Sequence, residues 1–515
     1  MISVSVGTTA AQLNALIANA ADGEVIVLDD GLHIFDAPIL IERDNVTLKG
    51  QSESGTIIQF SFATGQEASG IQANGGSKVY LGVSNQDISA DQTHITLAPD
   101  HGLQAGDVIY IYQANTQEYL NENGWTNVSW DDADERPFRE TIVVVESVDG
   151  ATVQLNHPIP YDMDAGEIKV FTIDAVENIT LSDFTVTYDL GTANPFDFVN
   201  AAPGFEGTSA IELNQTVDAN LSNITINEAA SNGLTLNTSI DVVGDSITIN
   251  GSHNKGGGGN GYGVELHESS FNTLTNLDIF DVRHAFVLSA WNAENDNTIH
   301  ISNTNRDINF HGSPDSGNVV TIDNAALEYD QSQNTSGLNG VWSLVSSGGA
   351  SHAATDIFGE NSILFTHGEG SSNNDVIYGA DGGAYLNGKF GYDTLVGGAG
   401  DDIIIGGTRK DTLTGGDGSD TFIFRMGDDL DTITDFQFGV GGDILIFAAN
   451  GSVDSFDDLR ITQVGDDVRI RYGSNSTVVI EDHDVADIDA ANIQFDPTGS
   501  LTATAYFGID FIEGM

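Results

Sequence analysis

The segment Gly263-Val-Glu-Leu-His267 belongs to a repeat that indicates the fold of this chain, and the repeat runs from Gly207 to about Ile322. In every copy apolar residues alternate with their neighbours; the other copies are Ala210-Ile-Glu-Leu-Asn214, Gly233-Leu-Thr-Leu-Asn237, Ala285-Phe-Val-Leu-Ser289 and Asp307-Ile-Asn-Phe-His311. Successive copies lie about 22 residues apart, except where the glycine-rich segment His253–Gly261 lengthens one step. A fixed period with short alternating strands is the signature of a solenoid, here an all-β, right-handed parallel β-helix.

Stacked coils place residues of equal phase side by side, about 4.8 Å apart. The alignment therefore maps a surface in columns. The first outward column holds Glu212, Thr235, Glu265, Val287 and Asn309, and the second holds Asn214, Asn237, His267, Ser289 and His311. A third column, just before the strands, holds Asn232, Tyr262, His284 and Arg306, and the residue that follows is Gly233, Gly263, Ala285 or Asp307.

Composition limits the possible partners and compartments. The 515 residues include 76 Asp+Glu against 16 Lys+Arg, a net charge of −60, so a basic surface for nucleic acid is not expected. This imbalance fits a protein that works in salt or in calcium, and a halophilic bias of the whole proteome is an equal alternative. Cysteine is absent, which excludes disulfides and thiolate metal sites. Neither an N-terminal Sec-type signal nor a membrane span is expected, because no apolar run is long enough.

Changes in pattern along the chain predict its domains. A helix over Ala10–Ala20 and the short strands after it are expected to cap residues 1–345, the β-helix. The period is lost over residues 91–170, which we interpret as an inserted β subdomain with a hairpin turn at Asp149-Gly150. Residues 346–369 are rich in Gly, Ser and Asn and are expected to form a linker.

Nine-residue steps follow from Gly370 to Ile423, and the best copy is Gly397-Gly-Ala-Gly-Asp-Asp-Ile-Ile-Ile405. Glycines let a turn aim its carbonyl oxygens at a cation, and the aspartate at position six adds a hard anionic oxygen. That position holds Asp375, Asp393, Asp402, Asp411 and Asp420, with Ala384 as the one failure. Two steps make one turn, so Asp393 is expected beside Asp411, and Asp402 beside Asp420.

The pattern resembles the repeats-in-toxin (RTX) calcium roll, whose consensus is G-G-x-G-x-D-x-U-x. The resemblance covers residues 370–450 and implies a parallel β-roll with its cap and calcium as the bound ion. It also implies export by the type I secretion machinery through a signal in the C-terminal β region, residues 451–515. The protein is then expected outside the cell, where calcium is abundant enough to fold the roll.

Basic residues gather in the central coils of this acidic chain. Five of the twelve histidines and three of the sixteen Lys+Arg lie between His253 and His311. Such a concentration predicts a groove for an anionic polysaccharide that the rest of the surface repels. The residues that we expect to bind this substrate are Lys255, Arg306, Glu212 and Asn237.

The segment Tyr262-Gly-Val-Glu-Leu-His-Glu268 resembles the Y-G-[FI]-D-P-H-E signature of secreted mannuronan C5-epimerases and related alginate lyases, which also join a parallel β-helix to RTX modules. The resemblance implies that Tyr262, Glu265 and His267 carry catalysis on a uronate polymer such as alginate. Here Glu replaces Asp and Leu replaces Pro, and Ser289 stands where the family has a further acidic residue. The full set of candidate catalytic residues is Tyr262, Glu265, His267, Arg283, His284, Asp307 and His311.

In that chemistry His267 or Tyr262 takes the C5 proton while Arg283, His284 or Arg306 neutralises the neighbouring carboxylate. Return of a proton gives epimerisation, and loss of the 4-O group gives β-elimination. Two alternatives stay open. Glu212 and Glu265 lie about 10 Å apart by strand spacing, which allows an inverting glycoside hydrolase. A non-catalytic adhesin would use these same side chains as ordinary polar ladders on a rigid rod.

Overall fold

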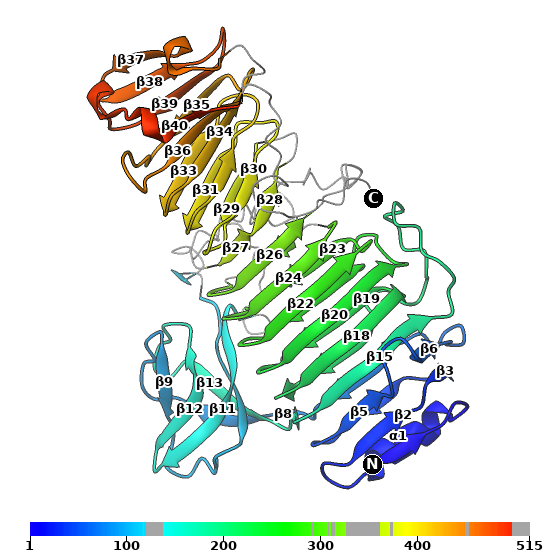
Figure 1. The fold of residues 1–515 in the computed structure, drawn as a ribbon. Helices are drawn as coiled ribbons and strands as arrows, with labels where there is room; N and C mark the ends of the chain where they lie inside the picture. Colours follow the sequence, from blue (N-terminus) through cyan, green and yellow to red (C-terminus); the bar gives the residue numbers. More distant parts are fainter. Residues whose placement is uncertain are drawn as a thin grey trace. The chain divides into compact units, whose positions relative to one another are not determined.

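The structure is a computed structural model that describes residues 1–116, 118–119, 137–289, 293–306, 308–310, 315–325, 361–370, 374–448 and 453–496. Nearly all of its elements are strands (Figure 1). The described chain divides after Val320 into two compact units; residues 361–362 belong to the first unit. Strand β26 (Val319–Ala325) spans this division. Of the described helices, none has the length and apolarity that a membrane span requires.

The first unit is a parallel β-helix built on two long parallel sheets. Its larger sheet contains β1 (Ile2–Val4), β2 (Val25–Leu28), β3 (Gly31–Phe35), β5 (Thr47–Gly50), β6 (Thr56–Phe60), β15 (Thr180–Tyr188), β18 (Asn220–Ala229), β20 (Val243–Ser252), β22 (Thr273–Phe280) and β24 (Thr298–Thr304). The second sheet contains β4 (Ile39–Ile41), β7 (Ile71–Asn74), β16 (Ser209–Asn214), β19 (Asn232–Asn237), β21 (Tyr262–His267), β23 (His284–Leu288) and β25 (Ile308–Phe310). Two short strands, β14 (Val176–Glu177) and β17 (Thr216–Val217), pair in a turn.

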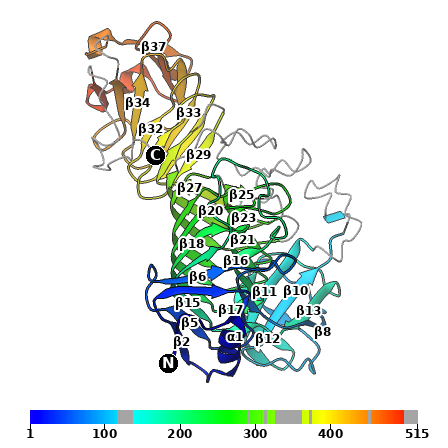
Figure 2. The same cartoon turned by 90° about the vertical axis from the view of Figure 1, so that its right-hand side faces the viewer.

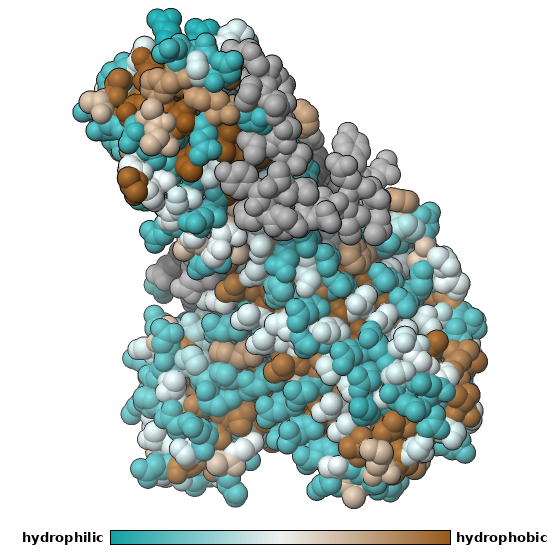
Figure 3. All heavy atoms as spheres, in the orientation of Figure 1, coloured by the Kyte–Doolittle hydropathy of each residue, from teal (hydrophilic) through white to brown (hydrophobic). Residues whose placement is uncertain are grey.

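The register of the second sheet confirms the columns. Glu265 pairs with Thr235 on one side and with Val287 on the other, and His267 pairs with Asn237. The alternate residues, among them Val264 and Leu266, are fully buried because they point into the helix. The larger sheet alternates in the same way, and its outer face over β15 to β24 is mostly hydrophilic (Figure 3).

A ladder of buried asparagines holds one of the turns between coils. The Nδ2 atom of Asn272 donates to Oδ1 of Asn297 at 2.9 Å, and Nδ2 of Asn297 donates to Oδ1 of Asn318 at 2.8 Å. These three side chains are fully buried. The ladder satisfies amide groups that would otherwise be stranded in the core, so these asparagines have a structural role.

The helix α1 (Ala10–Asn19) closes the N-terminal end, as expected. Thr9 and Gln12 form a capping box at its start. Ala10, Leu13 and Ile17 are buried beneath it. The helix thus covers the core that the first coil would otherwise expose.

The insert is a six-stranded antiparallel sheet in the order β8-β13-β10-β11-β12-β9. Its strands are β8 (Lys78–Val83), β9 (Gln92–Thr96), β10 (Val108–Gln113), β11 (Arg139–Asp149), β12 (Thr152–Ile159) and β13 (Ile168–Ile173). The hairpin turn at Asp149-Gly150 is confirmed, with Gly150 at φ +63°. The insert begins at Lys78 rather than at residue 91, because β8 pairs with β13.

The second unit is a parallel β-roll. One sheet stacks β29 (Val376–Gly379), β31 (Thr394–Ala399), β33 (Thr412–Asp417), β35 (Leu430–Ile433) and β39 (Thr477–Ile480), beside β27 (Ser362–Phe365). The other stacks β28 (His367–Glu369), β30 (Tyr385–Asn387), β32 (Ile403–Ile405), β34 (Thr421–Arg425), β36 (Ile444–Ala448) and β40 (Ile493–Phe495). The residues at position eight of each repeat are fully buried between the sheets: Ile377, Leu386, Leu395, Ile404, Leu413 and Phe422.

Residues 453–496 add strands to both sheets of this roll. Strand β39 pairs with β35, and β40 pairs with β36. An antiparallel pair, β37 (Arg460–Val464) and β38 (Asp467–Arg471), joins them, together with three short 3₁₀ turns at Phe456–Asp458, Val485–Asp487 and Ala490–Asn492. The part of the expected secretion signal that follows residue 496 lies outside the described residues.

Candidate functional site

Glu265 lies on β21 at the centre of the candidate site, and only 8% of its surface is exposed. The amide of Asn232 donates from Nδ2 to Oε2 of Glu265 at 3.0 Å. The hydroxyl of Ser289 donates to Oε1 of Glu265 at 3.4 Å. Asn232 and Ser289 come from the preceding and the following coil, so the solenoid itself supplies the partners of this carboxyl.

Burial raises the pKa of Glu265 to about 7. Desolvation is the largest cause, and the negative charge of Glu212 adds to it. Hydrogen bonds from Ser289, Thr235 and Asn232 oppose the shift. A carboxyl that titrates near neutral pH can both give and take a proton under physiological conditions, which is the requirement for a general acid or base.

His267 stands two residues after Glu265 on the same face of β21, and about a third of its side chain is exposed. Its Nε2 atom lies 2.7 Å from Oγ of Ser289 and 3.8 Å from Oε1 of Glu265. The three side chains therefore form one connected cluster across two coils. An imidazole held in this way offers a second proton-transfer group to a ligand above the sheet.

Tyr262 begins β21 and lies next to His284 of the following coil, with ring centroids 5.7 Å apart. Both side chains are buried. Burial raises the pKa of Tyr262 to about 12, an effect that the positive charge of Arg283 opposes. The guanidinium of Arg283 lies 6.0 Å from the Tyr262 ring, and its Nη1 donates to the carbonyl oxygen of Gly256 at 2.9 Å. Arg283 is half-buried and is the candidate cation beside the cluster.

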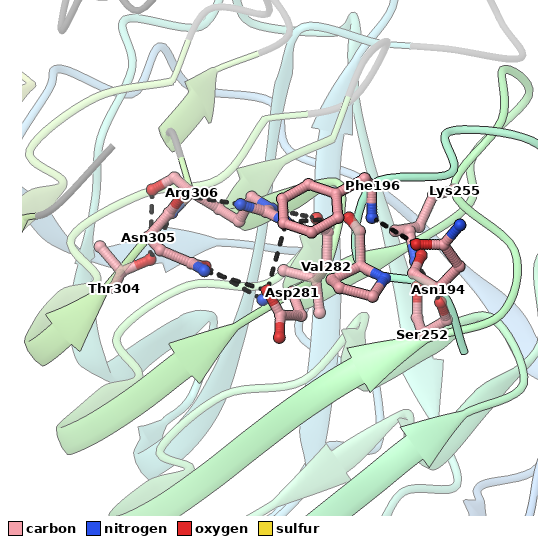
Figure 4. A network of polar contacts seen from close by, with 10 residues as sticks. Asn194, Phe196, Ser252, Lys255, Asp281, Val282, Thr304, Asn305 and Arg306 are labelled. Carbon is pink, nitrogen blue, oxygen red and sulfur yellow. Dashed lines mark hydrogen bonds and ion pairs between the residues drawn. The ribbon is translucent and has the colours of Figure 1, made fainter. Parts of the chain in front are cut away.

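Arg306 does not face a groove as the sequence predicted. Its guanidinium is buried and donates to the carbonyl oxygens of Val282 at 2.7 Å, Asn305 at 3.1 Å and Pro195 at 3.1 Å (Figure 4). Nη2 also lies 3.3 Å from Oδ1 of Asp281. The planar fork of Arg306 is thus used within the protein, where it fixes chain segments that are far apart in sequence.

Lys255 is buried beside Arg306 and is also used internally. Its Nζ donates to the carbonyl oxygens of Asn194 at 2.9 Å and Ser252 at 2.7 Å (Figure 4). Burial lowers the pKa of Lys255 to about 8, and the charge of Arg306 lowers it further. Lys255 and Arg306 therefore anchor the loop that carries Asn194 and the exposed ring of Phe196, and their expected direct contact with substrate is not supported by these positions.

The two other predicted substrate-binding residues lie on neighbouring coils of the second sheet. Glu212 is half-exposed and accepts a hydrogen bond from Nδ2 of Asn214 at 3.1 Å. Asn237 donates from Nδ2 to Oδ1 of Asn214 at 3.1 Å, and Asn214 donates in turn to Asn74. This asparagine column is a hydrogen-bonded ladder between coils, so Asn237 has a structural role as an alternative to the predicted substrate binding.

Two predicted catalytic residues, Asp307 and His311, lie outside the described residues.

The cluster includes two residues that were not among the candidates from the sequence, Asn232 and Ser289. Asn232 donates to Glu265 and accepts from the main-chain N–H of Tyr262 at 3.1 Å, so it positions both residues. Ser289 bridges Glu265 and His267. Both stood in the predicted columns next to the candidates, and that adjacency was the available signal.

A cavity of about 440 Å³ opens elsewhere on the first unit. It is lined by turns of the N-terminal coils, including Asp22, Arg43, Asp44 and Asp174, and an Arg43–Asp22 ion pair at 2.6 Å crosses its rim. None of the candidate residues lines this cavity. This cavity is therefore separate from the candidate site.

In the second unit the predicted aspartates stack in two columns. The main-chain N–H of Asp393 donates to Oδ1 of Asp411 at 2.9 Å, and that of Asp402 donates to Oδ1 of Asp420 at 2.9 Å. Asp375 precedes Asp393 in its column. The expected pairing of aspartates is confirmed.

The second carboxylate oxygen of these aspartates fits a cation. The Oδ2 atoms of Asp393, Asp402, Asp411 and Asp420 are buried and have no hydrogen-bond donor. Burial raises the pKa of Asp393 and Asp420 to about 7 and that of Asp402 and Asp411 to about 6. Buried anionic oxygens without donors need a positive charge, and calcium prefers such hard oxygens.

Each column extends one step beyond the predicted repeats. Asp411 donates from its main-chain N–H to Asp431 at 3.1 Å, and Asp420 donates to Asp443 at 2.9 Å. The signal for these residues was an Asp followed two positions later by an apolar residue. Among the described residues no three acidic or histidine side chains converge, so main-chain carbonyl oxygens would supply the remaining calcium ligands.

Comparison with known families agrees with the roll. Residues 368–395, 378–408 and 396–431 match the model of the RTX calcium-binding nonapeptide repeat. The matched segments contain all five predicted calcium-binding aspartates, and calcium is the ion that these repeats bind. No curated protein sequence matches this chain.

Solved structures of other proteins resemble parts of this chain in fold. The tailspike protein gp49 from Pseudomonas phage LKA1 is similar with a TM-score of 0.50 and 15% identity, over 86% of this chain and 72% of the tailspike. The tailspike gp61 of Pseudomonas phage phi297 has a TM-score of 0.44 at 15% identity, over 85% and 68%. An exopolygalacturonase from Thermotoga maritima has 0.30 at 9% identity, over 87% and 88%. The first likeness supports the fold, and at this identity it concerns the fold alone.

Proposed function

We propose that this protein is a secreted, calcium-dependent enzyme that modifies an anionic uronate polysaccharide such as alginate, by C5-epimerisation or β-elimination. The observation that carries the proposal is Glu265: a buried carboxyl with a pKa of about 7, joined to His267 and Ser289 on the second sheet of the β-helix. The signature-like segment Tyr262–Glu268 supplies Glu265 and His267, and the following coil supplies Ser289. The calcium-binding repeats of the second unit support the extracellular setting.

The chemistry needs a base that removes the C5 proton and a group that stabilises the resulting anion. His267 or ionised Glu265 takes the proton, and the electron pair moves into the uronate carboxylate. Arg283 is the described cation beside this cluster that can neutralise that carboxylate. In epimerisation C5 then receives a proton from the opposite ring face. In elimination the electron pair forms the C4–C5 double bond while the 4-O group leaves with a proton from the acid.

Tyr262 can act as the opposing proton donor, because its raised pKa keeps the phenol protonated at neutral pH. A tyrosine that stays protonated is a poor base in the resting protein and a suitable acid for a leaving oxygen. The assignment therefore gives Tyr262 the acid role and His267 or Glu265 the base role. Asn232 holds both Tyr262 and Glu265 in place.

A glycoside hydrolase is the second candidate, and Glu212 favours it. Glu212 and Glu265 stand in one column, separated by the coil of Thr235, and their charges interact. An inverting hydrolase needs one carboxyl with a raised pKa as the acid and a second carboxylate as the base on the other side of the bond. Glu265 and Glu212 would fill these roles.

One assay separates these reactions. Calcium-loaded protein is incubated with alginate, polymannuronate, pectate and neutral glycans. Growth of the ultraviolet absorbance of unsaturated uronates identifies elimination, and exchange of the C5 proton with heavy water without that absorbance identifies epimerisation. New reducing ends without either signal identify hydrolysis. The Glu265→Gln variant is the control. If the wild-type protein converts none of these polymers, the proposal is contradicted.

A further inference from the structure

One face of the insert carries aromatic and basic side chains that the proposed chemistry does not use. We call it the insert face and define it by Lys78, Tyr80, Tyr110, Tyr112, Lys169 and Phe171. The strands β8, β13 and β10 lie side by side in this order, and Figure 2 shows them next to the second sheet of the β-helix. The six residues come from these three strands.

Strand register brings the six residues together. Phe171 on the central strand β13 pairs with Tyr80 on one side and with Tyr110 on the other. Lys169, two residues earlier on β13, pairs with Tyr112. Residues that pair in adjacent strands point to the same face, so aromatic and basic side chains alternate over a continuous area.

Ring contacts confirm this arrangement. Tyr80 meets Phe171 edge-on at 5.3 Å, and Phe171 stacks on Tyr112 at 5.8 Å with only 16° between the planes. Lys169 Nζ lies 5.2 Å from the centre of the Tyr112 ring, and Lys78 Nζ lies 3.7 Å from that of Tyr110. The rings and the ammonium groups thus hold one another in position before any ligand arrives.

The two ends of this side of the insert sheet differ in their surroundings. At one end Val108, Ile142 and Ile173 pack against Val217 and Ile240 of the β-helix turns. Tyr110 and Tyr112 are buried in this same cluster, and Phe171 packs against it. At the other end Tyr80 is 57% exposed, and Lys169 and Phe171 are half-buried. The buried rings therefore help to dock the insert, while Tyr80 and part of Phe171 and Lys169 remain accessible to solvent.

The insert face adjoins the candidate site through two contacts. Lys78 Nζ lies 3.0 Å from Oε2 of Glu268, the residue that follows His267. Glu140, which pairs with Tyr112, accepts a hydrogen bond from the main-chain N–H of Ala293 at 3.3 Å. Ala293 lies four residues beyond Ser289. The insert therefore stands at the C-terminal ends of the strands that carry Glu265, His267 and Ser289.

We propose that the insert face is a binding subsite for the uronate chain, where the rings of Tyr80 and Phe171 stack on a sugar and Lys169 pairs with its carboxylate. The flat C–H face of a pyranose packs well on an aromatic ring, and an ammonium group matches a uronate carboxylate. Lys78 on this face forms an ion pair with Glu268, and Lys169 is assigned to the uronate carboxylate. This inference rests on the proposed function.

The test measures binding separately from turnover. Short oligouronates, which calcium does not gel, are titrated into the calcium-loaded full-length Glu265→Gln protein by calorimetry. Tyr80→Ala and Lys169→Gln are added singly to this background. Val79→Ala is the matched control on the same strand, because Val79 is 59% exposed and precedes Tyr80 on the other face of β8. Tyr378→Ala and Lys410→Gln, exposed residues of the roll, control for loss of any surface tyrosine or lysine.

We expect Tyr80→Ala and Lys169→Gln each to weaken binding by about tenfold, and the controls to leave it unchanged. In otherwise wild-type protein the same two changes should raise KM and leave kcat nearly constant. Binding equal to that of the controls overturns the inference, even if the wild-type protein converts the polymer. Equal losses with neutral oligosaccharides overturn the role of Lys169 in uronate recognition. If the wild-type protein converts no uronate polymer and no oligouronate binds, the proposed function itself fails.

Discussion

The hydroxyl oxygen of Ser289 lies 2.7 Å from Nε2 of His267. The two residues stand at neighbouring positions of adjacent coils, His267 at the end of β21 and Ser289 directly after β23. The same hydroxyl reaches Oε1 of Glu265 at 3.4 Å, so one small residue orients both candidate proton-transfer groups. Catalysis by such groups depends on position as much as on pKa, so the coil spacing contributes directly to the proposed reaction.

Glu265→Gln should lower kcat by about 10²- to 10⁴-fold, the usual contribution of a general acid or base. The glutamine keeps the shape of the side chain and can still accept from Asn232, so the fold should persist. Initial rates and a thermal melt of the same preparation check both points. Glu212→Gln is the matched change two coils away in the same column. A comparable loss in Glu212→Gln would favour the hydrolase, and an almost unchanged rate would favour epimerisation or elimination.

The pH dependence of kcat/KM should show a limb near pH 7, because that is the pKa of Glu265 in the folded protein. Below this pH the carboxyl is protonated and can serve as an acid; above it the carboxylate can serve as a base. A rate that falls as pH rises through 7 assigns the acid role, and a rate that falls as pH drops through 7 assigns the base role. A limb that persists in Glu265→Gln would belong to another group.

The same raised pKa affects stability. The folded protein binds the Glu265 proton more tightly than the unfolded chain, in which the pKa of this carboxyl is about 4.5. Ionisation of Glu265 should therefore lower the stability of the wild type as the pH rises from about 4.5 to 7. The Glu265→Gln variant lacks this titration, so its stability relative to the wild type should be higher above pH 7 than below pH 4.5. Thermal melts at pH 5 and pH 8 measure the difference. An equal difference at both pH values would mean that ionisation of Glu265 does not cause the decline.

Calcium removal should unfold the roll, because the stacked carboxylates with donor-free Oδ2 atoms then repel one another. Asp411→Asn removes one anionic oxygen donor and should weaken calcium binding by about tenfold. Asp417→Asn is the control, since Asp417 is exposed on β33. Calcium titrations followed by far-ultraviolet circular dichroism report the affinity. If both variants lost the same amount of calcium affinity, net charge alone would determine that affinity.

Ala384→Asp should restore a calcium ligand. Ala384 is fully buried, and its main-chain N–H donates to Oδ1 of Asp402, as the aspartates of the column do. The Cβ atom of Ala384 faces Gly379 in the way that the Asp402 side chain faces Gly397. A residue larger than glycine would not fit at position 379 or 397. Calorimetry should therefore find about one additional calcium ion or a tighter overall affinity. Unchanged binding would show that Ala384 is not the missing element of this site.

Arg306→Met should destabilise the first unit by about 3 kcal/mol, because it strips a buried charge from the carbonyl groups of Val282, Asn305 and Pro195. It should also raise KM, since the loop around Pro195 loses an anchor. Lys49→Met is the control: it removes a half-exposed ion pair with Asp183 and should cost less than about 1 kcal/mol. Chemical denaturation and steady-state kinetics measure both effects. A KM change in Lys49→Met of the same size would contradict the role of the loop.

The β-helix, its columns and the calcium roll could be predicted from residue spacing alone. A solenoid converts spacing along the chain directly into contact between coils, because every coil advances by one strand spacing. The register of Thr235, Glu265 and Val287, and the pairing of Asp393 with Asp411, could be predicted for this reason. Burial of the apolar residue in every nonad followed from the same periodicity.

The contacts of the charged residues near the site could not be predicted in this way, because they depend on how distant segments pack. The columns placed Arg306 beside a groove. In the structure a loop from a distant part of the sequence accepts hydrogen bonds from Arg306 through Pro195 and from Lys255 through Asn194. The insert begins at Lys78 because β8 pairs with β13 across a long stretch of intervening sequence, which no local pattern encodes. The pKa of Glu265 likewise depends on desolvation by everything packed around it. Local periodicity specifies repeated contacts between coils, whereas the surroundings of a charged side chain and the pairing of distant strands arise only when the whole chain is folded.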